Sequence, residues 1–379
     1  MRVVVAIDSF KGSLSSMEAG AAVKEAVLKL DPDADVTVKP LADGGEGTVD
    51  AFAAGPCASM ITLTVKGPLL KPVEAKYCIL TDTNTAVIEM AAAAGIPLIS
   101  AEERNPLETT TYGVGELIKD AIDRGCRRFI IGIGGSATND GGTGMLTALG
   151  YSFLNQNGSP IALGAKGLKD LVSIRADHVI PELRECTFYI ACDVTNPLCG
   201  ENGCSAVYAP QKGADAQMIA DMDAWLANYA SIAQAFTPKA DANYAGAGAA
   251  GGLGFAFLSF TNATLRSGIN IVLEETKIEN DIKNADIVVT GEGRLDGQTV
   301  MGKAPIGVAK LAKKYGKKVI AFSGCVTEEA VACNDHGIDA FFPILREICT
   351  LEKALDRRYA YQNLRATAEQ VFRLLTDKK

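Results

Sequence analysis

The stretch RVVVAI at residues 2–7 decides the fold, because it is a short, continuous run rich in β-branched residues. Such a run predicts a strand that is buried on both faces, as in a parallel sheet. Ser15 and Glu18 then form the pattern of a helix capping box, and apolar residues recur at helical spacing as far as Leu30. A second strand is predicted at residues 35–41, so the chain opens as a strand–helix–strand unit.

The same alternation of strands and helices returns near the end of the chain. Strands are predicted at residues 286–290, 318–322 and 339–344, and helices at residues 304–315 and after Leu351. Together with the first two strands, these make five parallel strands with helices on both faces. That arrangement is a small doubly wound sheet, flavodoxin-like in size, and it places the chain in the α/β class.

Residues 65–284 follow a different pattern and are predicted to form a larger, mixed α/β domain inserted into the first one. Its opening strands are separated by turn residues, which predicts a β-meander. The predicted strands of this region are residues 61–66, 73–80, 85–90, 129–133 and 187–192. The first domain then consists of residues 1–64 and 285–379, and we expect the active site in the cleft between two dissimilar α/β domains.

Composition and charge argue against several classes of protein. The chain has 379 residues, which suits two domains, and its net charge of −8 is wrong for a nucleic-acid coat protein. Only two histidines are present, so triad hydrolases and multi-histidine metal sites are poor candidates. No stretch resembles a signal peptide or a membrane span, and the ten cysteines lack metal-ligand spacing. We therefore expect a cytoplasmic protein with reduced thiols that binds neither membrane nor nucleic acid; homo-oligomer formation is left open.

The loops that follow the predicted strands share one composition: glycine, small hydroxyl residues, asparagine and acids. In open α/β sheets, ligands bind at the carboxyl ends of the strands. Glycine lets backbone amides approach a phosphate, and acids hold Mg²⁺ or accept a proton from a hydroxyl. Lys11 and Arg294 could neutralise phosphate or carboxylate charge. These loops therefore favour phosphoryl transfer to an alcohol. The loops are residues 8–13, 43–48, 134–142, 193–197 and 291–297.

Each loop also has a purely structural interpretation. Asp43 and Glu46 fit a capping box at the start of a helix, and Asp8 or Asp193 could cap a helix. The loop at residues 134–142 is longer and richer in glycine than a simple connection needs, which favours a functional role there.

Two motifs resemble nucleotide-binding fingerprints but lack the required context. GAGAAG at residues 246–251 matches the dinucleotide pattern, yet residues 237–244 before it are polar and predict no strand. A tightly packed helix start or a substrate-facing loop is a better interpretation. GQTVMGKA at residues 297–304 nearly matches a phosphate-binding P-loop, but Ala304 replaces the Ser or Thr that binds Mg²⁺, and the motif begins late after the predicted strand. Lys303 could still lie near a phosphate.

Several long stretches of the chain resemble the bacterial glycerate kinase family. They are AIDSFKGSLSSMEAG (6–20), PLADGGEGTVDA (40–51), GIGGSATNDGGTGML (132–146), CDVTNPLCGENG (192–203), GAGAAGGLGFA (246–256) and TGEGRLDGQTVMGKAP (290–305). The resemblance runs from end to end and is to the bacterial type without a P-loop. It implies ATP-dependent, Mg²⁺-requiring phosphorylation of D-glycerate to 2-phosphoglycerate in glyoxylate or sugar-diacid breakdown. It also implies a fold of two dissimilar α/β domains with the active site between them.

Loop position, combined with this resemblance, suggests a role for individual residues. Asp193 is the first candidate for the base that accepts the hydroxyl proton, and Asp8 is the second. Lys11 would offset the charge of the transferred phosphoryl group, and Arg294 would bind the carboxylate of glycerate. Further candidates are Ser9, Thr195 and Asn196 for the substrate; Gly44, Gly45, Gly134, Gly135, Ser136, Asn139 and Lys303 for phosphate and nucleotide; and Asp296, Glu292 and Asp140 for Mg²⁺.

Two alternatives belong to other functional classes. An NAD- or FMN-dependent oxidoreductase would use the flavodoxin-like sheet and the GAGAAG segment, but it lacks the strand before the glycines. A non-catalytic, two-domain binding protein for small molecules would bind glycerate without turning over ATP.

Overall fold

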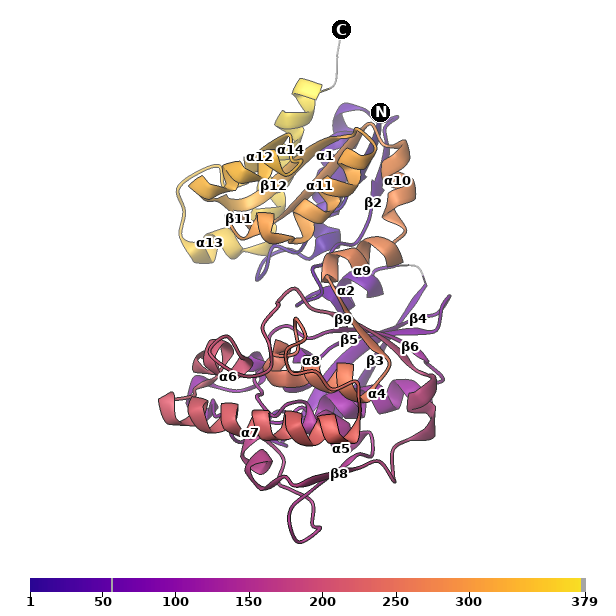
Figure 1. The fold of residues 1–379 in the computed structure, drawn as a ribbon. Helices are drawn as coiled ribbons and strands as arrows, with labels where there is room; N and C mark the ends of the chain where they lie inside the picture. Colours follow the sequence, from indigo (N-terminus) through magenta and orange to yellow (C-terminus); the bar gives the residue numbers. More distant parts are fainter. Residues whose placement is uncertain (56, 376–379) are drawn as a thin grey trace. The chain divides into compact units, whose positions relative to one another are not determined.

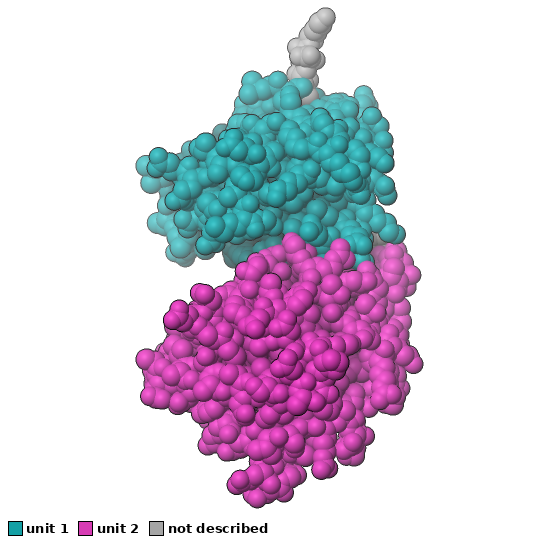
Figure 2. All heavy atoms as spheres, viewed as in Figure 1, with its two compact units in different colours: residues 1–43, 50–55, 269–379 teal, residues 44–49, 56–268 magenta. Residues whose placement is uncertain are grey.

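A computed structural model describes residues 1–55 and 57–375. The last four residues of the predicted first domain, 376–379, lie outside this range. The chain divides into two compact units (Figures 1 and 2): unit 1 comprises residues 1–43, 50–55 and 269–379, and unit 2 comprises residues 44–49 and 56–268. The six residues 44–49 thus belong to unit 2, although the chain on either side of them belongs to unit 1.

Unit 1 is built on a five-stranded, entirely parallel sheet in the order β13-β12-β11-β1-β2. Counted along the chain this order is 2-1-3-4-5, the flavodoxin-like arrangement, so the predicted fold of this part is confirmed. The strands are β1 (Arg2–Val5), β2 (Asp35–Val38), β11 (Ile287–Leu295), β12 (Lys318–Val326) and β13 (Ala340–Pro343).

The helices of unit 1 cover both faces of this sheet. Helices α1 (Ser16–Leu30) and α14 (Arg357–Leu375) pack together over the face that carries Val3, Val5 and Ile7. Helix α11 (Ala304–Lys314) packs on β11 and β12. The capping box of Ser15 and Glu18 is present at the start of α1, as predicted. The other helices of the region are α2 (Thr48–Ala53), α9 (Gly268–Glu275), α10 (Ile278–Asn284), α12 (Ala332–Asp335) and α13 (Leu351–Leu355), with 3₁₀ turns at Thr299–Met301 and Glu328–Val331.

Unit 2 contains a six-stranded mixed sheet in the order β10-β9-β6-β5-β4-β3. Its first three strands form the predicted antiparallel meander, and β5, β6, β9 and β10 are parallel. The strands are β3 (Ala58–Lys66), β4 (Pro72–Leu80), β5 (Thr85–Glu89), β6 (Arg128–Gly132), β9 (Thr187–Ala191) and β10 (Ala263–Arg266); β7 (Ser152–Leu154) and β8 (Ser173–Arg175) form a separate ribbon.

One large apolar core lies between this sheet and the helices of unit 2. No helix in the described part of the chain is both long and apolar enough to cross a membrane. The helices are α3 (Ala91–Ala94), α4 (Tyr112–Asp123), α5 (Thr143–Ala148), α6 (Cys204–Tyr208), α7 (Ala216–Phe236) and α8 (Ala249–Phe260), with 3₁₀ turns at Ile96–Leu98, Ala101–Glu103, Ala165–Asp170, Pro181–Glu185 and Pro210–Lys212.

Two local predictions are wrong, and glycine explains both. The helix expected from Asp43 begins only at Thr48, because Gly44 and Gly47 adopt left-handed backbone angles that a helix does not use. Strand β11 runs on to Leu295 instead of ending at residue 290, so the P-loop-like motif does not begin late after its strand. A Cβ atom at Gly291 would lie 2.0 Å from the carbonyl oxygen of Phe322, so glycine permits close approach of β11 and β12 here.

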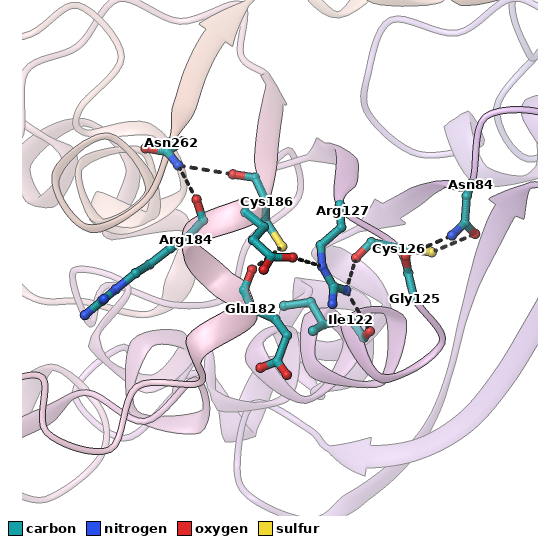
Figure 3. Close-up of polar contacts among 10 residues, drawn as sticks. Asn84, Ile122, Gly125, Cys126, Arg127, Glu182, Arg184, Cys186 and Asn262 are labelled. Atoms are coloured by element: carbon teal, nitrogen blue, oxygen red, sulfur yellow. Dashed lines mark hydrogen bonds and ion pairs between the residues drawn. The ribbon is translucent and has the colours of Figure 1, made fainter.

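At the amino ends of the parallel strands in unit 2, side chains donate hydrogen bonds to backbone carbonyls of neighbouring segments (Figure 3). Arg127, which precedes β6, donates to the carbonyl of Cys126 at 2.9 Å. Asn262, which precedes β10, donates to the carbonyls of Arg184 at 3.1 Å and Cys186 at 3.4 Å. The glycine-rich loops lie at the opposite, carboxyl ends of these strands.

Candidate functional site

The topology of unit 1 points to the gap between the ends of β1 and β11. The chain leaves β1 toward β2 on one side, whereas β11, β12 and β13 lie on the other side, so the strand order reverses between β1 and β11. Ligands bind outside the carboxyl ends of strands at such a switch point. The loop after β1 lies against the last part of β11 there, because a Cβ atom on Gly293 would lie 3.4 Å from the Cα atom of Phe10.

Asp8 lies three residues after the end of β1, and its pKa is the most strongly raised of the acids at this point. Its side chain is buried, with 4% exposed, and its backbone amide donates to the carbonyl of Gly291 at 2.8 Å. The pKa of Asp8 is raised to about 7, chiefly by burial and then by the negative charge of Asp43, while the amide of Ser9 and the charge of Lys11 lower it. A carboxyl group with this pKa can accept a proton near neutral pH.

Glu292 and Asp296 provide two further carboxylates at the end of β11. Glu292 is buried, which raises its pKa, and it accepts a hydrogen bond from the hydroxyl of Thr299 at 2.6 Å. Asp296 accepts a hydrogen bond from the amide of Gln298 at 2.9 Å. Within residues 1–55 and 57–375, no group of three or more His, Cys, Asp or Glu is arranged to hold a metal ion. One or two carboxylates nevertheless fit Mg²⁺, which takes its remaining ligands from phosphate and water.

Three cations lie at or near these acids. Lys11 is exposed in the loop after β1. Arg294 and Lys303 approach Asp296 at 3.5 and 3.8 Å. Arg294 keeps 63% of its side chain exposed, so its guanidinium is available to an anion. Lys303 immediately precedes α11, so the P-loop-like segment does bring a lysine to the start of a helix, with Ala304 in place of the hydroxyl.

In unit 2, residues 44–49 lie across the carboxyl ends of β6 and β9. A Cβ atom on Gly44 would lie 2.4 Å from the Cβ atom of Ala191, and one on Gly132 would lie 2.2 Å from the carbonyl oxygen of Gly44. The amide of Val49 donates to the carboxylate of Glu89 at 2.8 Å, which ties down the far end of the segment. Only glycine fits these contacts at position 44, where φ is +87°.

The loop after β6 carries backbone amides that have no acceptor among the described residues. Gly134 and Gly135 are exposed, and Gly135 has a left-handed backbone with φ of +74°. No described residue accepts a hydrogen bond from the amides of Gly134, Gly135 or Ser136. Successive free amides in such a turn form a concave site for an anion. A Cβ atom on Gly134 would lie 3.6 Å from the Cα atom of Gly45, so the two predicted phosphate-binding segments, residues 44–45 and 134–136, lie side by side.

Asn139 and Asp140, in contrast, face the interior of unit 2. Both are completely buried. Asp140 accepts hydrogen bonds from the amide of Thr111 at 2.8 Å and its hydroxyl at 2.9 Å, and from the amides of Gly142 at 3.1 Å and Gly144 at 3.3 Å. These donors give Asp140 a structural role in fastening the loop.

The loop after β9 carries three more of the predicted residues. Asp193 and Thr195 are exposed, and Asp193 accepts a hydrogen bond from the amide of Gly268 at 3.2 Å. The side chain of Asn196 donates to the carbonyl of Asn202 at 2.8 Å and accepts from the hydroxyl of Tyr208 at 2.6 Å. Both polar atoms of the Asn196 side chain are thus already hydrogen-bonded within the protein, which gives this residue a structural role.

The GAGAAG segment forms the tightly packed start of α8, as the structural interpretation predicted. Ala250, Gly251 and Gly252 all adopt left-handed angles. A Cβ atom on Gly251 would lie 2.1 Å from the carbonyl oxygen of Thr138, and the amide of Gly141 donates to the carbonyl of Gly251 at 2.9 Å. The glycines therefore support the loop after β6 from inside unit 2.

The sequence did not single out Lys212, which also lies beneath this loop. Its side chain is 1% exposed, and its ammonium donates to the hydroxyl of Ser136 at 2.9 Å and to the carbonyl of Thr138 at 2.6 Å. Burial lowers the pKa of Lys212 to about 8. No sequence signal could have found it, because a lysine in a short turn is usually on the surface.

Comparison with known proteins finds similarity along nearly the whole chain. The sequence profile described as the glycerate kinase family matches residues 3–376. A protein named glycerate kinase from Haemophilus influenzae is 46% identical over 378 residues, covering 100% of both chains. One named glycerate 2-kinase from Escherichia coli is 46% identical and covers 96% of this chain and 95% of that one. The crystal structure of a Salmonella typhimurium LT2 protein assigned as glycerate kinase 2 superposes with a TM-score of 0.91, at 46% identity, covering 99% of this chain and 98% of that one. The chain therefore belongs to the glycerate kinase family, whose members are phosphotransferases.

Proposed function

We propose that this protein transfers the γ-phosphoryl group of ATP to the 2-hydroxyl of D-glycerate, giving 2-phosphoglycerate and ADP. The observation that carries the proposal is the 46% identity, over the full length of both chains, to a protein named glycerate kinase. The name of the Escherichia coli relative supports the 2-hydroxyl as the acceptor. The ten free thiols agree with a reducing cytoplasm as the place of the reaction.

Asp8 is the carboxylate whose environment best suits the base. It would accept the hydroxyl proton of glycerate while that oxygen bonds to the γ-phosphorus and the bond to the bridging oxygen of ADP breaks. A general base is most effective when its pKa lies near the working pH, and the pKa of Asp8 is about 7. Asp193 is the competing candidate; it is exposed and holds the amide of Gly268.

The other groups would bind and orient the two substrates. Arg294 offers a planar, largely exposed guanidinium to the carboxylate of glycerate, where two parallel hydrogen bonds fix its orientation. Lys11 would offset the charge on the transferred phosphoryl group. The free amides of Gly134, Gly135 and Ser136 would bind phosphate oxygens.

Mg²⁺ would be held by Asp296 and Glu292 together with the phosphates of ATP. When bound, it supplies positive charge that offsets the charge of the triphosphate. Asp140 stays outside this proposal, because backbone amides and hydroxyl groups already surround its carboxylate.

The reaction is tested by incubating the purified protein with ATP, Mg²⁺ and D-glycerate and recording the ³¹P NMR spectrum. A phosphate ester on the 2-carbon couples to one proton and gives a doublet, whereas an ester on the 3-carbon couples to two protons and gives a triplet. A doublet supports the proposal, and a triplet would keep the kinase but overturn the acceptor position. Folded protein that forms no ATP-dependent ester would refute the proposed function.

Asp8 and Asp193 are distinguished by Asp8→Asn and Asp193→Asn. If Asp8 is the base, Asp8→Asn lowers turnover by about 10²–10⁴-fold. In Asp193→Asn, kcat/KM should then still fall at low pH as it does in the wild type, because the base that becomes protonated there is unchanged. The reverse pattern, with activity retained in Asp8→Asn, would make Asp193 the base.

A further inference from the structure

Lys212 is a buried cation with no part in the function proposed above. It ends the 3₁₀ turn Pro210–Lys212, and its side chain is 1% exposed. Its ammonium reaches the inner side of the loop after β6, where it donates to the hydroxyl of Ser136 at 2.9 Å and to the carbonyl of Thr138 at 2.6 Å. Both acceptors are neutral oxygens.

The charge of this ammonium is not balanced by an ion pair. Among the described residues, no carboxylate forms a salt bridge with Lys212. Asp140 and Cys204 raise the pKa of Lys212, but burial lowers it by more, and the carboxylate of Asp140 is occupied by other donors. A buried, unpaired charge is unfavourable unless a counter-charge approaches it. The environment of Lys212 therefore favours an anion nearby.

The outer side of the same loop independently favours an anion. The amides of Gly134, Gly135 and Ser136 have no acceptor in the part of the chain that the structure describes. Because Ser136 accepts a hydrogen bond from Lys212, its own hydroxyl proton must point elsewhere. The loop thus combines free donors outside with positive charge inside.

We propose that Lys212 is a positioning residue for phosphate binding. Its ammonium fixes Ser136 and Thr138, so that the amides of Gly134–Ser136 stand ready for a phosphate group, and its charge stabilises that group through the loop. This inference rests on the proposed function, in which the phosphate belongs to ATP. It assigns Lys212 no contact with the reacting atoms.

The test measures the affinity of Lys212→Met for ATP and for inorganic pyrophosphate by calorimetry, without glycerate. Loss of a charge-assisted hydrogen bond should weaken binding by about 10- to 100-fold. Lys169→Met is the matched control, because Lys169 is an exposed lysine of the same unit and its loss changes the net charge equally. The KM for ATP should rise in Lys212→Met while the KM for glycerate stays the same. Equal weakening by both substitutions, or unchanged affinity in Lys212→Met, overturns the proposal.

A double-mutant cycle with Ser136→Ala tests whether Lys212 acts through the loop. If it does, Lys212→Met weakens nucleotide binding less in the Ser136→Ala background than in the wild type. Strictly additive effects overturn the proposal. If Lys212→Met does not fold, Lys212→Gln carries the same test, since its neutral amide can still donate to an oxygen but brings no charge.

These outcomes are separable from those of the proposed function. A wild-type protein that binds ATP but never phosphorylates glycerate refutes the function, while weaker binding in Lys212→Met still supports the inference. A wild-type protein that phosphorylates glycerate, with unchanged ATP affinity in Lys212→Met, refutes the inference alone.

Discussion

Replacing Asp8 by asparagine should lower turnover by about 10²–10⁴-fold and yet stabilise unit 1. The pKa of Asp8 rises from 3.8 to about 7 because the carboxylate is buried and Asp43 and Glu292 repel it. The folded state therefore binds this proton more tightly than the unfolded chain does. The resulting stability is fully present below about pH 4 and is lost as the pH rises through about 7.

The magnitude follows from the size of that shift. At about 1.4 kcal/mol per pKa unit, the change from 3.8 to about 7 amounts to about 4 kcal/mol. Asparagine carries no charge at any pH, and its side-chain oxygen can still accept the hydrogen bond from the amide of Ser9. Asp8→Asn should therefore be more stable than the wild type by up to about 4 kcal/mol at about pH 8 and nearly equal to it at about pH 4.

The assay follows the two units separately. Urea unfolding is monitored by hydrogen exchange of peptides from β1 and β11, which belong to unit 1. Fluorescence of Trp225, the only tryptophan, reports on unit 2 and serves as the internal control, because its transition should not change. A variant no more stable than the wild type at about pH 8, or equally stabilised at about pH 4, would refute the argument from burial.

Four further predictions test other parts of the two units. Asp43→Asn removes one of the charges that raise the pKa of Asp8, so the acidic limb of the kcat/KM profile should move to lower pH; an unmoved limb contradicts the coupling. Gly44→Ala should lose more stability in urea unfolding than Gly200→Ala, since both positions have positive φ but only the Cβ atom at Gly44 would clash, at 2.4 Å; equal losses would exclude the close contact as the cause. Arg294→Lys keeps the charge but loses the planar fork, so steady-state kinetics should show a raised KM for glycerate with a smaller change in KM for ATP. Asn262→Ala removes hydrogen bonds at the amino ends of the strands and should lower thermal stability by about 1 kcal/mol without changing kcat, which a direct role in catalysis would contradict.

The parts of the fold that follow local rules were predictable from the sequence. After Arg2, strand β1 is an apolar run of valines, and the cap of α1 needs only Ser15 and Glu18. The end of β11 was not predictable, because Gly291 and Gly293 are typical of a loop. Their place in a strand depends on pairing with β12, which the local sequence does not show. Strand β10 was missed for a related reason: its sequence, ATLR, is short and only partly apolar, so its pairing with β9 decides its structure.

The candidate site shows the same division. Glycines and acids follow β1, β6 and β9, and in each sheet parallel topology brings the carboxyl ends of neighbouring strands to one edge. Which side chains face outward was not predictable: Asp140 and Asn139 belong to the predicted loop but point into the core. Lys212 lies far from that loop in sequence, so only the folded chain reveals their contact.

The central strand of unit 1 has a consequence for synthesis on the ribosome. β1 lies between β2 and β11, and Val3 pairs with Ile287. The ribosome adds about 5–20 residues per second, so β11 is synthesised roughly 15–60 s after β1. During this time residues 57–268 have already emerged, so unit 2 can fold around residues 44–49 while β1 still has one open edge. A nascent chain paused before residue 287 would thus carry a folded unit 2 and an amino-terminal strand whose open edge can pair with another chain.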